Sequence, residues 1–186
     1  SVTVPARTVA VFTQAAGDRI DRTVTPEPDP AAAQWVSSGD GRWWLRYPDG
    51  SYPANERVVR DGVTYSFDAN CWMKTGWQIE DGVWHYYAPS GAMATGWTAV
   101  GGTWYYLDPN TGAMATGWLK DGDTWYYLHG SGAMATGWVN LGGAWFYLNG
   151  NGTMATGWVN LGGTWYFLSG DGRMATGWVK DGESWF

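Results

Sequence analysis

The residues of this chain best suited to chemistry are tryptophans that recur in regularly spaced pairs. The sequence has 16 tryptophans among 186 residues. Flat indole faces attract cations through the ring quadrupole, and they also stack on sugar rings. The first member of each pair follows a glycine, at Trp77, Trp97, Trp118, Trp138, Trp158 and Trp178. The second members are Trp84, Trp104, Trp125, Trp145, Trp165 and Trp185. This pattern suits ligand binding by ring faces and equally suits rings that form the core of a repeat array.

The pairs belong to a repeat with a period of about 20 residues. The clearest copy runs from Met114 to Leu128, and a methionine stands four residues before the first tryptophan of every regular copy. A fixed period of this length predicts an array of small supersecondary units. Because a lone two-stranded hairpin is marginal in water, each unit must stack on its neighbours.

Turn chemistry predicts that each copy is a β-hairpin. Asp121-Gly122 lies between two β-prone runs, and Asp-Gly favours a two-residue type I′ turn. This loop pairs Trp118 directly with Trp125 and sets Tyr127 on the same face, with Tyr126 on the opposite face. We therefore expect Trp118 to line a binding site and Tyr126 to be structural. The expected structural equivalents of Tyr126 are Tyr105, Phe146 and Tyr166.

The same reasoning extends to the other copies. The loop is expected at Leu141-Gly142, Leu161-Gly162 and Asp181-Gly182. The hairpin of Trp77 is expected to turn differently, because Gly82 comes one residue late. Aliphatic residues are few, so aromatic rings are expected to supply much of the core, with the methionines as packing residues that touch the sites at most.

Composition excludes several classes of function. A net charge of −6 argues against nucleic acid as a partner, since phosphate binding needs a basic surface. No run reaches the roughly 18 apolar residues of a membrane span. The single cysteine, Cys71, rules out an internal disulfide framework and is expected to be packed.

Catalytic and metal-binding groups form no pattern of their own. The two histidines, His85 and His129, stand in different copies without matching partners. Asp121, Asp171 and Asp181 fall at expected turns, where aspartate is favoured for conformational reasons. The prediction is a binding module that is not an enzyme and has no cofactor or metal.

Four regions are expected along the chain. Residues 1–22 are predicted to be the terminal strand of a preceding domain, and residues 23–34 a Pro-rich linker. Residues 35–71 hold degenerate copies that cap the stack, and Val58 takes the place of Trp118, which should spoil an aromatic site there. Residues 72–186 are the regular copies. Because the sequence ends inside a copy, we expect it to be a piece of a longer protein.

Through Met-Ala-Thr-Gly-Trp and Trp-Tyr-Tyr-Leu, the array resembles the choline-binding (cell-wall-binding) repeats of Gram-positive surface proteins and lysins. The resemblance implies an all-β fold, a left-handed solenoid of stacked β-hairpins. It also implies a secreted, cell-wall-associated module that binds the choline of (lipo)teichoic acid or another cell-wall glycopolymer. Residues 1–14 resemble the end of the C-terminal β-domain of pullulanase-type glycoside hydrolases, which implies that the module can be the C-terminal part of a larger enzyme.

In this family a choline cage takes two aromatic residues from one repeat and one from the next, often with a methionine nearby. Carried over by motif, the predicted cages are Trp77, Trp84 and Tyr106; Trp97, Trp104 and Tyr127; Trp118, Trp125 and Tyr147; and Trp138, Trp145 and Phe167. The pair Trp158 and Trp165 would need a ring from beyond Phe186. Ring faces suit a quaternary ammonium, because it has no N–H to donate.

Two other functions remain open at the level of sequence. The repeats also resemble the glucan-binding regions of glucosyltransferases, so an α-glucan or other carbohydrate is an alternative ligand. A structural or adhesion stalk would need no ligand at all. A cavity closed on three sides would favour choline, whereas an open aromatic strip with polar neighbours would favour glucan.

Overall fold

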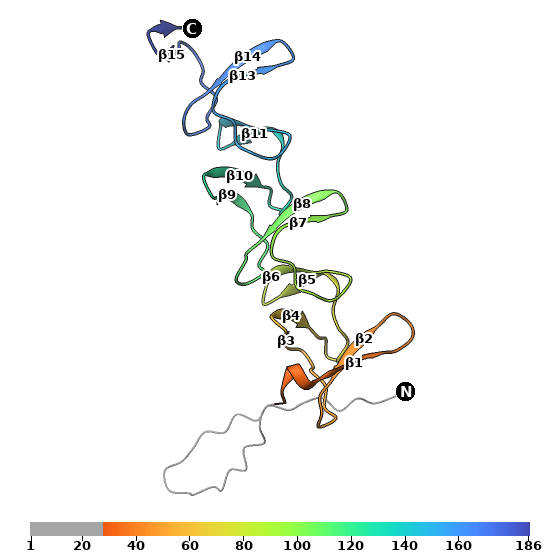
Figure 1. The fold of residues 1–186 in the computed structure, drawn as a ribbon. Coiled ribbons are helices and arrows are strands. Elements are labelled where there is room, and N and C mark those ends of the chain that lie inside the picture. The colour runs from red at the N-terminus through yellow and green to blue at the C-terminus, as the bar shows by residue number, and fades with distance from the viewer. Residues whose placement is uncertain (1–27) are drawn as a thin grey trace, which may run out of the picture. The chain divides into compact units, whose positions relative to one another are not determined.

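The computed structural model describes residues 28–186, which form antiparallel β-hairpins in two compact units. Each strand pairs with the strand next to it in sequence, giving eight two-stranded sheets in this range (Figure 1). The predicted all-β fold of repeated hairpins is confirmed. No helix in the described range has the length and apolar character needed to cross a membrane.

The first unit ends at Ala94 and the second runs from Thr95 to Phe186. The first unit contains the short 3-10 helix η1 (Pro30–Ala32) and strands β1 (Gln34–Ser37), β2 (Trp43–Arg46), β3 (Arg57–Arg60), β4 (Val63–Ser66), β5 (Gly76–Glu80) and β6 (Val83–Tyr87). The second contains β7 (Gly96–Val100), β8 (Thr103–Leu107), β9 (Gly117–Asp121), β10 (Thr124–Leu128), β11 (Gly137–Leu141), β12 (Ala144–Leu148), β13 (Gly157–Leu161), β14 (Thr164–Leu168), β15 (Lys180–Asp181) and β16 (Ser184–Trp185).

The two-residue hairpin loops lie one residue further along the chain than predicted from the sequence. In β9–β10, Asp121 pairs with Thr124, and Trp118 pairs with Tyr127 rather than with Trp125. The predicted loop at Asp121-Gly122 is therefore wrong. A type I′ turn needs positive φ at both loop residues, which a leucine at position 141 would adopt only with strain. In β11–β12 two glycines meet this need, since Gly142 and Gly143 have φ of 61° and 89°.

The hairpin that was expected to deviate has the same register as the others. In β5–β6, Glu80 pairs with Val83, so Asp81 and Gly82 form the two-residue loop with φ of 52° and 79°. Gly82 is thus not late; it occupies the second loop position, as Gly102, Gly143 and Gly163 do in their hairpins. A shift of one loop residue keeps side chains on their faces, so Trp118 and Trp125 still share a face, as diagonal neighbours.

The deepest core is built by the residue at the end of each second strand or, for Phe67, directly after it. The side chain of Leu128 is fully buried, as are its equivalents Phe67, Tyr87, Leu107, Leu148 and Leu168. Each forms an isolated β-bridge with the methionine that follows it, such as Leu128 with Met134. Four of these core residues are leucines, so the expectation that aromatic rings supply much of the core holds better for the first unit than for the second.

The amino-terminal boundary also differs from the prediction. Asp29 caps η1 by accepting a hydrogen bond from the Ala31 backbone N–H at 2.9 Å. Ala33 is buried in a cluster with Leu45, Tyr47, Val58 and Phe67, and β1 starts at Gln34. The expected linker over residues 23–34 is therefore too long, since its last residues are folded. The strand expected in residues 1–22 lies outside the described residues.

Cys71 is buried, as expected, and adopts a φ of 66° in the connection between β4 and β5. Burial raises the pKa of its thiol, with Asp68 and Glu56 adding to the effect. The thiol therefore stays protonated and acts as a small packed side chain.

Candidate aromatic binding sites

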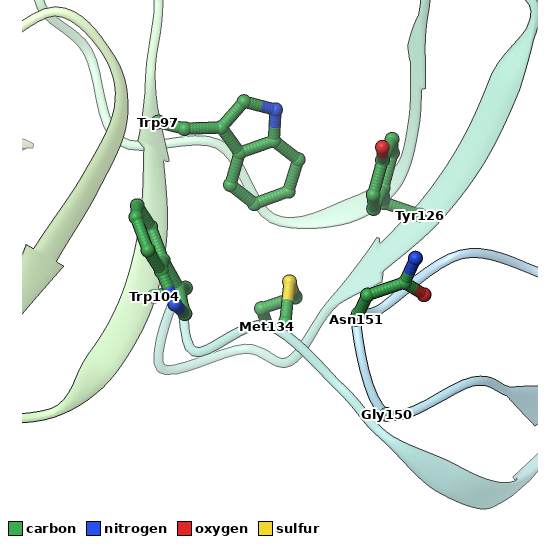
Figure 2. A pocket seen from close by; sticks show the side chains of 6 residues that line it. All are labelled: Trp97, Trp104, Tyr126, Met134, Gly150 and Asn151. Atoms are coloured by element: carbon green, nitrogen blue, oxygen red, sulfur yellow. The ribbon is translucent and has the colours of Figure 1, made fainter.

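One site is a cavity of about 320 Å³, here called the Trp97 cavity, that joins parts of three consecutive copies. Trp97 and Trp104 come from β7–β8, Tyr126 from β10, and Met134 from the connection before β11. Gly150 and Asn151 close the far side. Figure 2 shows the three rings around a common space, with the sulfur of Met134 pointing toward it.

The register explains why these rings meet. Trp97 lies one residue into β7, across from Tyr106, and its ring centroid is 5.2 Å from that of Tyr106. Its other neighbour is Tyr126 of the next hairpin, at 4.7 Å and an interplanar angle of 59°. The third ring is therefore Tyr126, not Tyr127, and Tyr126 does not have the purely structural place expected for it.

The same correction applies along the second unit. Trp118 contacts Phe146 of the following hairpin at 4.9 Å, and Trp138 contacts Tyr166 at 5.0 Å. The rings assigned from the sequence lie instead against the tryptophan of their own hairpin: Tyr106 against Trp97, Tyr127 against Trp118, Tyr147 against Trp138, and Phe167 against Trp158. Adjacent residues of a strand face opposite sides. The ring that contacts the preceding hairpin is therefore the neighbour of the predicted one, and the predicted grouping of the third ring is wrong.

The paired tryptophans themselves are brought together as predicted. The rings of Trp118 and Trp125 are 6.3 Å apart at 89°, and those of Trp138 and Trp145 are 6.3 Å apart at 87°. Trp77 and Trp84 in the first unit share the same arrangement at 6.3 Å and 87°. The second member remains well exposed, with 47% of Trp104 accessible.

A methionine forms part of each cavity, held there by the backbone. The Met134 N–H donates to the carbonyl of Trp104 at 2.8 Å, and the Met154 N–H donates to that of Trp125 at 2.8 Å. A glycine packs over each methionine: a Cβ on Gly152 would lie 2.3 Å from the Met134 Sδ. The methionines are therefore lining residues, a closer role than the occasional contact expected from the sequence.

A second cavity of about 350 Å³, the Trp118 cavity, repeats this plan. It is lined by Trp118, Trp125, Phe146, Met154, Gly170, Asp171 and Arg173. The Arg173 Nε lies 3.4 Å from the Asp171 Oδ2, so this rim carries a compensated pair of charges. A hydrogen bond from Ser169 lowers the pKa of the exposed Asp171 carboxyl, which is therefore ionised at neutral pH.

The third cavity lies where the sequence reasoning expected only worn capping copies. The Trp35 cavity, of about 360 Å³, is lined by Trp35, Trp43, Tyr65, Met73, Pro89 and Ser90. Trp35 and Tyr65 are 4.9 Å apart at 66°, and the Met73 N–H donates to the Trp43 carbonyl at 2.7 Å. In the sequence, Trp35 and Trp43 flank a glycine-rich turn, and Met73 follows Trp43 at the same separation as Met134 follows Trp104. This pattern could have predicted the cavity.

The next copy has lost its aromatic site, at different positions from those predicted. Since Arg57 pairs with Ser66 as Trp97 pairs with Tyr106, Arg57 and not Val58 occupies the first tryptophan position. Val58 is buried in the core instead. Thr64 occupies the second position, since its carbonyl accepts from the Met93 N–H at 2.8 Å. This junction holds no pair of indole faces.

An ionic cluster takes the place of the aromatic site at that junction. The Glu80 carboxylate accepts hydrogen bonds from Arg57 Nε at 2.7 Å, Ser66 Oγ at 2.6 Å, Lys74 Nζ at 2.9 Å and Tyr87 OH at 2.9 Å. Burial alone would raise the pKa of Glu80, but these four hydrogen bonds outweigh it and lower the pKa from 4.5 to about 2. The Glu80 carboxylate is thus paired with cations of the chain itself, Arg57 and Lys74.

The last described copy completes one more ring pair. Trp158 contacts Phe186 at 5.1 Å, so the ring expected from beyond the sequence is supplied by Phe186 itself. Phe186 is held by two backbone hydrogen bonds to Val179, each 2.9 Å long. Among residues 28–186, histidine, cysteine and acidic side chains form no group suited to hold a metal ion.

Stacked hairpins with aromatic cavities between them define a class of repeat protein that binds ligands through ring faces. The model of the choline-binding repeat matches residues 55–96, 74–116, 94–136 and 135–171. The chain therefore belongs to the choline-binding repeat family. No curated protein sequence matches it.

Solved structures from Streptococcus pneumoniae share the fold. CbpJ is 43% identical with a TM-score of 0.70, and the match covers 76% of this chain and 51% of CbpJ. Choline binding protein F is 42% identical with a TM-score of 0.74, covering 80% of this chain and 53% of that protein. The modular autolysin LytC is 26% identical with a TM-score of 0.59, covering 82% and 36%. The chain thus spans about half the length of the first two.

Proposed function

We propose that this chain is a cell-wall-binding module that holds the choline groups of a (lipo)teichoic acid or a related cell-wall glycopolymer in its aromatic cavities. The observation that carries the proposal is the set of three rings and one methionine around the Trp97 cavity. A quaternary ammonium is bound by desolvated ring faces, at about 0.5–2 kcal/mol per ring. The same plan in the Trp118 and Trp35 cavities supports a multivalent module.

The geometry favours choline over an α-glucan. Each cavity is walled by rings on three sides, while a sugar chain is better served by an open aromatic strip with polar groups to bond its hydroxyls. Three rings and Met134 dominate the lining of the Trp97 cavity, and Asn151 is its one amide side chain. The module is proposed to anchor a longer secreted protein to the cell surface, with any catalytic activity residing outside this chain.

Titration of the chain with choline chloride and, separately, with a maltooligosaccharide tests this function. We expect choline to change tryptophan fluorescence with roughly millimolar affinity, because three rings must also offset the cost of association. Maltooligosaccharide should leave the fluorescence unchanged. Saturable binding of the sugar without a response to choline would contradict the proposal.

A choline-bearing polymer is expected to bind far more tightly than free choline. Several cavities that engage one polymer gain avidity of roughly 10²–10⁴. The measurement is binding to choline-decorated and choline-free cell walls, with free choline as competitor. Equal retention on both kinds of wall would show that the cavities do not mediate attachment.

The replacement Gly152→Ala is expected to weaken choline binding at the Trp97 cavity. The added Cβ would collide with the Met134 Sδ at 2.3 Å and push that methionine out of place. Gly163→Ala is the matched control, because its φ of +89° is close to the +85° of Gly152 but no atom lies within 4 Å of the new Cβ. Both variants should lose about 1–2 kcal/mol of stability from left-handed strain.

Choline titration and thermal unfolding of the two alanine variants separate these effects. The expected result is weaker binding only in Gly152→Ala, with a loss of stability at least as large as that of Gly163→Ala. If both variants bound choline alike, Met134 would not be part of the site.

A further inference from the structure

In several hairpins the last residue of the first strand contacts the residue at the first tryptophan position of the hairpin before it. In β9 this residue is Asp121, whose Oδ2 accepts a hydrogen bond from the Trp97 indole N–H at 2.9 Å. At the carboxyl end, Asp181 of β15 accepts from the Trp158 indole N–H at 2.9 Å. The same position in β5 is Glu80, which accepts from Arg57.

The residue at this position differs in charge from one cavity to the next. The register makes Leu141 the equivalent for the Trp118 cavity and Arg60 the equivalent for the Trp35 cavity. The Arg60 Cζ lies 6.0 Å from the ring centroid of Trp35, with 19% of the side chain exposed. Its nearest charged partner, Asp61, is 79% exposed and 3.5 Å from the Arg60 Nε.

We propose, building on the proposed function, that this single position grades the affinity of the cavities for a cationic ligand. Asp121 makes the Trp97 cavity the strongest of the three, Leu141 leaves the Trp118 cavity intermediate, and Arg60 makes the Trp35 cavity the weakest. The module thus combines sites that fill at different choline concentrations.

Two physical effects act in the same direction. A carboxylate that accepts the indole N–H fixes the ring and polarises it, which strengthens the attraction of its face for a cation. It also places a negative charge one ring away from the bound ammonium. The guanidinium of Arg60 does the opposite, since it competes for the Trp35 face and repels a second cation.

The Glu80 cluster supports this assignment within the same molecule. At that junction the acidic residue is retained while the tryptophan is replaced by Arg57, and the carboxylate binds the arginine directly. A carboxylate at this position, Glu80, therefore binds a cation at the first tryptophan position, Arg57. In the Trp97 cavity the indole lies between the two charges, so the interaction is weaker and the ligand remains exchangeable.

The experiment exchanges the charges at this position in the full chain. Site-specific dissociation constants for choline are read from the indole N–H signals of Trp97, Trp118 and Trp35 in proton–nitrogen correlation spectra. Asp121→Leu is expected to weaken the Trp97 cavity by about 3- to 10-fold, and Leu141→Asp to strengthen the Trp118 cavity by about 3-fold. Arg60→Leu should strengthen the Trp35 cavity by about 3- to 10-fold.

An uncharged ligand and a conservative variant separate charge from positioning. Asp121→Asn keeps an acceptor for the indole N–H but removes the charge. It should weaken choline binding while leaving the affinity for the uncharged tert-butyl isostere of choline, in which carbon replaces the quaternary nitrogen, unchanged. A variant that loses both ligands equally would mean that Asp121 only supports the fold.

The outcomes also separate this inference from the proposed function. Equal choline affinities at all three cavities, unmoved by the exchanges, would overturn the grading while the choline-binding function stands. The absence of choline binding to the unmodified chain would instead overturn the proposed function. The expected result is graded occupancy that is reversed by the exchanges.

Discussion

Replacement of Tyr126 by alanine is expected to weaken choline binding at the Trp97 cavity by roughly 2- to 30-fold, which corresponds to the loss of one cation–π contact. Tyr126 lies 4.7 Å from Trp97 and supplies the ring of the following hairpin. The Trp118 cavity should keep its affinity, because Tyr126 does not line it. The measurement is a choline titration that resolves the two cavities.

Tyr127→Ala is the matched comparison on the neighbouring residue. Tyr127 packs against the buried cluster of Ala135, Phe146 and Leu148, and its ring lies 5.3 Å from Trp118. Loss of a fully buried aromatic side chain lowers the free energy of unfolding by about 3–5 kcal/mol. Tyr127→Ala should cost less than this because Tyr127 is partly exposed, and it should leave the Trp97 cavity intact. If Tyr127→Ala rather than Tyr126→Ala emptied the Trp97 cavity, the register described above could not be correct.

The replacement Glu80→Gln is expected to destabilise the unit that ends at Ala94 by about 2–4 kcal/mol, somewhat less than the loss of a fully buried pair. The amide cannot compensate the charges of Arg57 and Lys74, which lie at 2.7 Å and 2.9 Å from the carboxylate. Only 12% of the Glu80 side chain is exposed, so water replaces the lost contacts poorly. Asp81→Asn, at an exposed loop position with a φ of 52°, is the control and should be nearly neutral.

The rate of amide hydrogen exchange in residues 57–87 measures this loss of stability. Faster exchange there in Glu80→Gln, with the second unit unchanged, is the predicted pattern, because contacts in such arrays are mainly between neighbours. Equal exchange in Glu80→Gln and Asp81→Asn would mean that the cluster adds nothing to stability.

The same cluster makes the stability of the first unit depend on pH. The pKa of Glu80 is lowered on folding from 4.5 to about 2. Its contribution, roughly 3 kcal/mol, is therefore fully present above pH 4.5 and is lost as the pH falls toward 2. Acid titration of the unfolding midpoint should show this slope in the unmodified chain and a shallower one in Glu80→Gln.

Much of the fold was determined by local features of the sequence. The period of the Gly-Trp pairs and the glycines of the loops were sufficient to predict hairpins. Because side chains alternate along a strand, the shared face of Trp118 and Trp125 was also predictable, and the one-residue error in the loop did not change it. Cys71 was expected to be packed because an exposed free thiol is unusual in a secreted protein, and its side chain is buried.

Only the tertiary structure decided which ring of the next copy completes each cavity. Tyr126 and Tyr127 are adjacent aromatic residues, and neither type nor spacing tells which one faces the preceding hairpin. That choice depends on the path of the connection, where a backbone hydrogen bond joins Met134 to Trp104 across 30 residues. The exchange of an aromatic site for the Arg57–Glu80 pair was likewise hidden, because a contact between groups 23 residues apart leaves no local pattern.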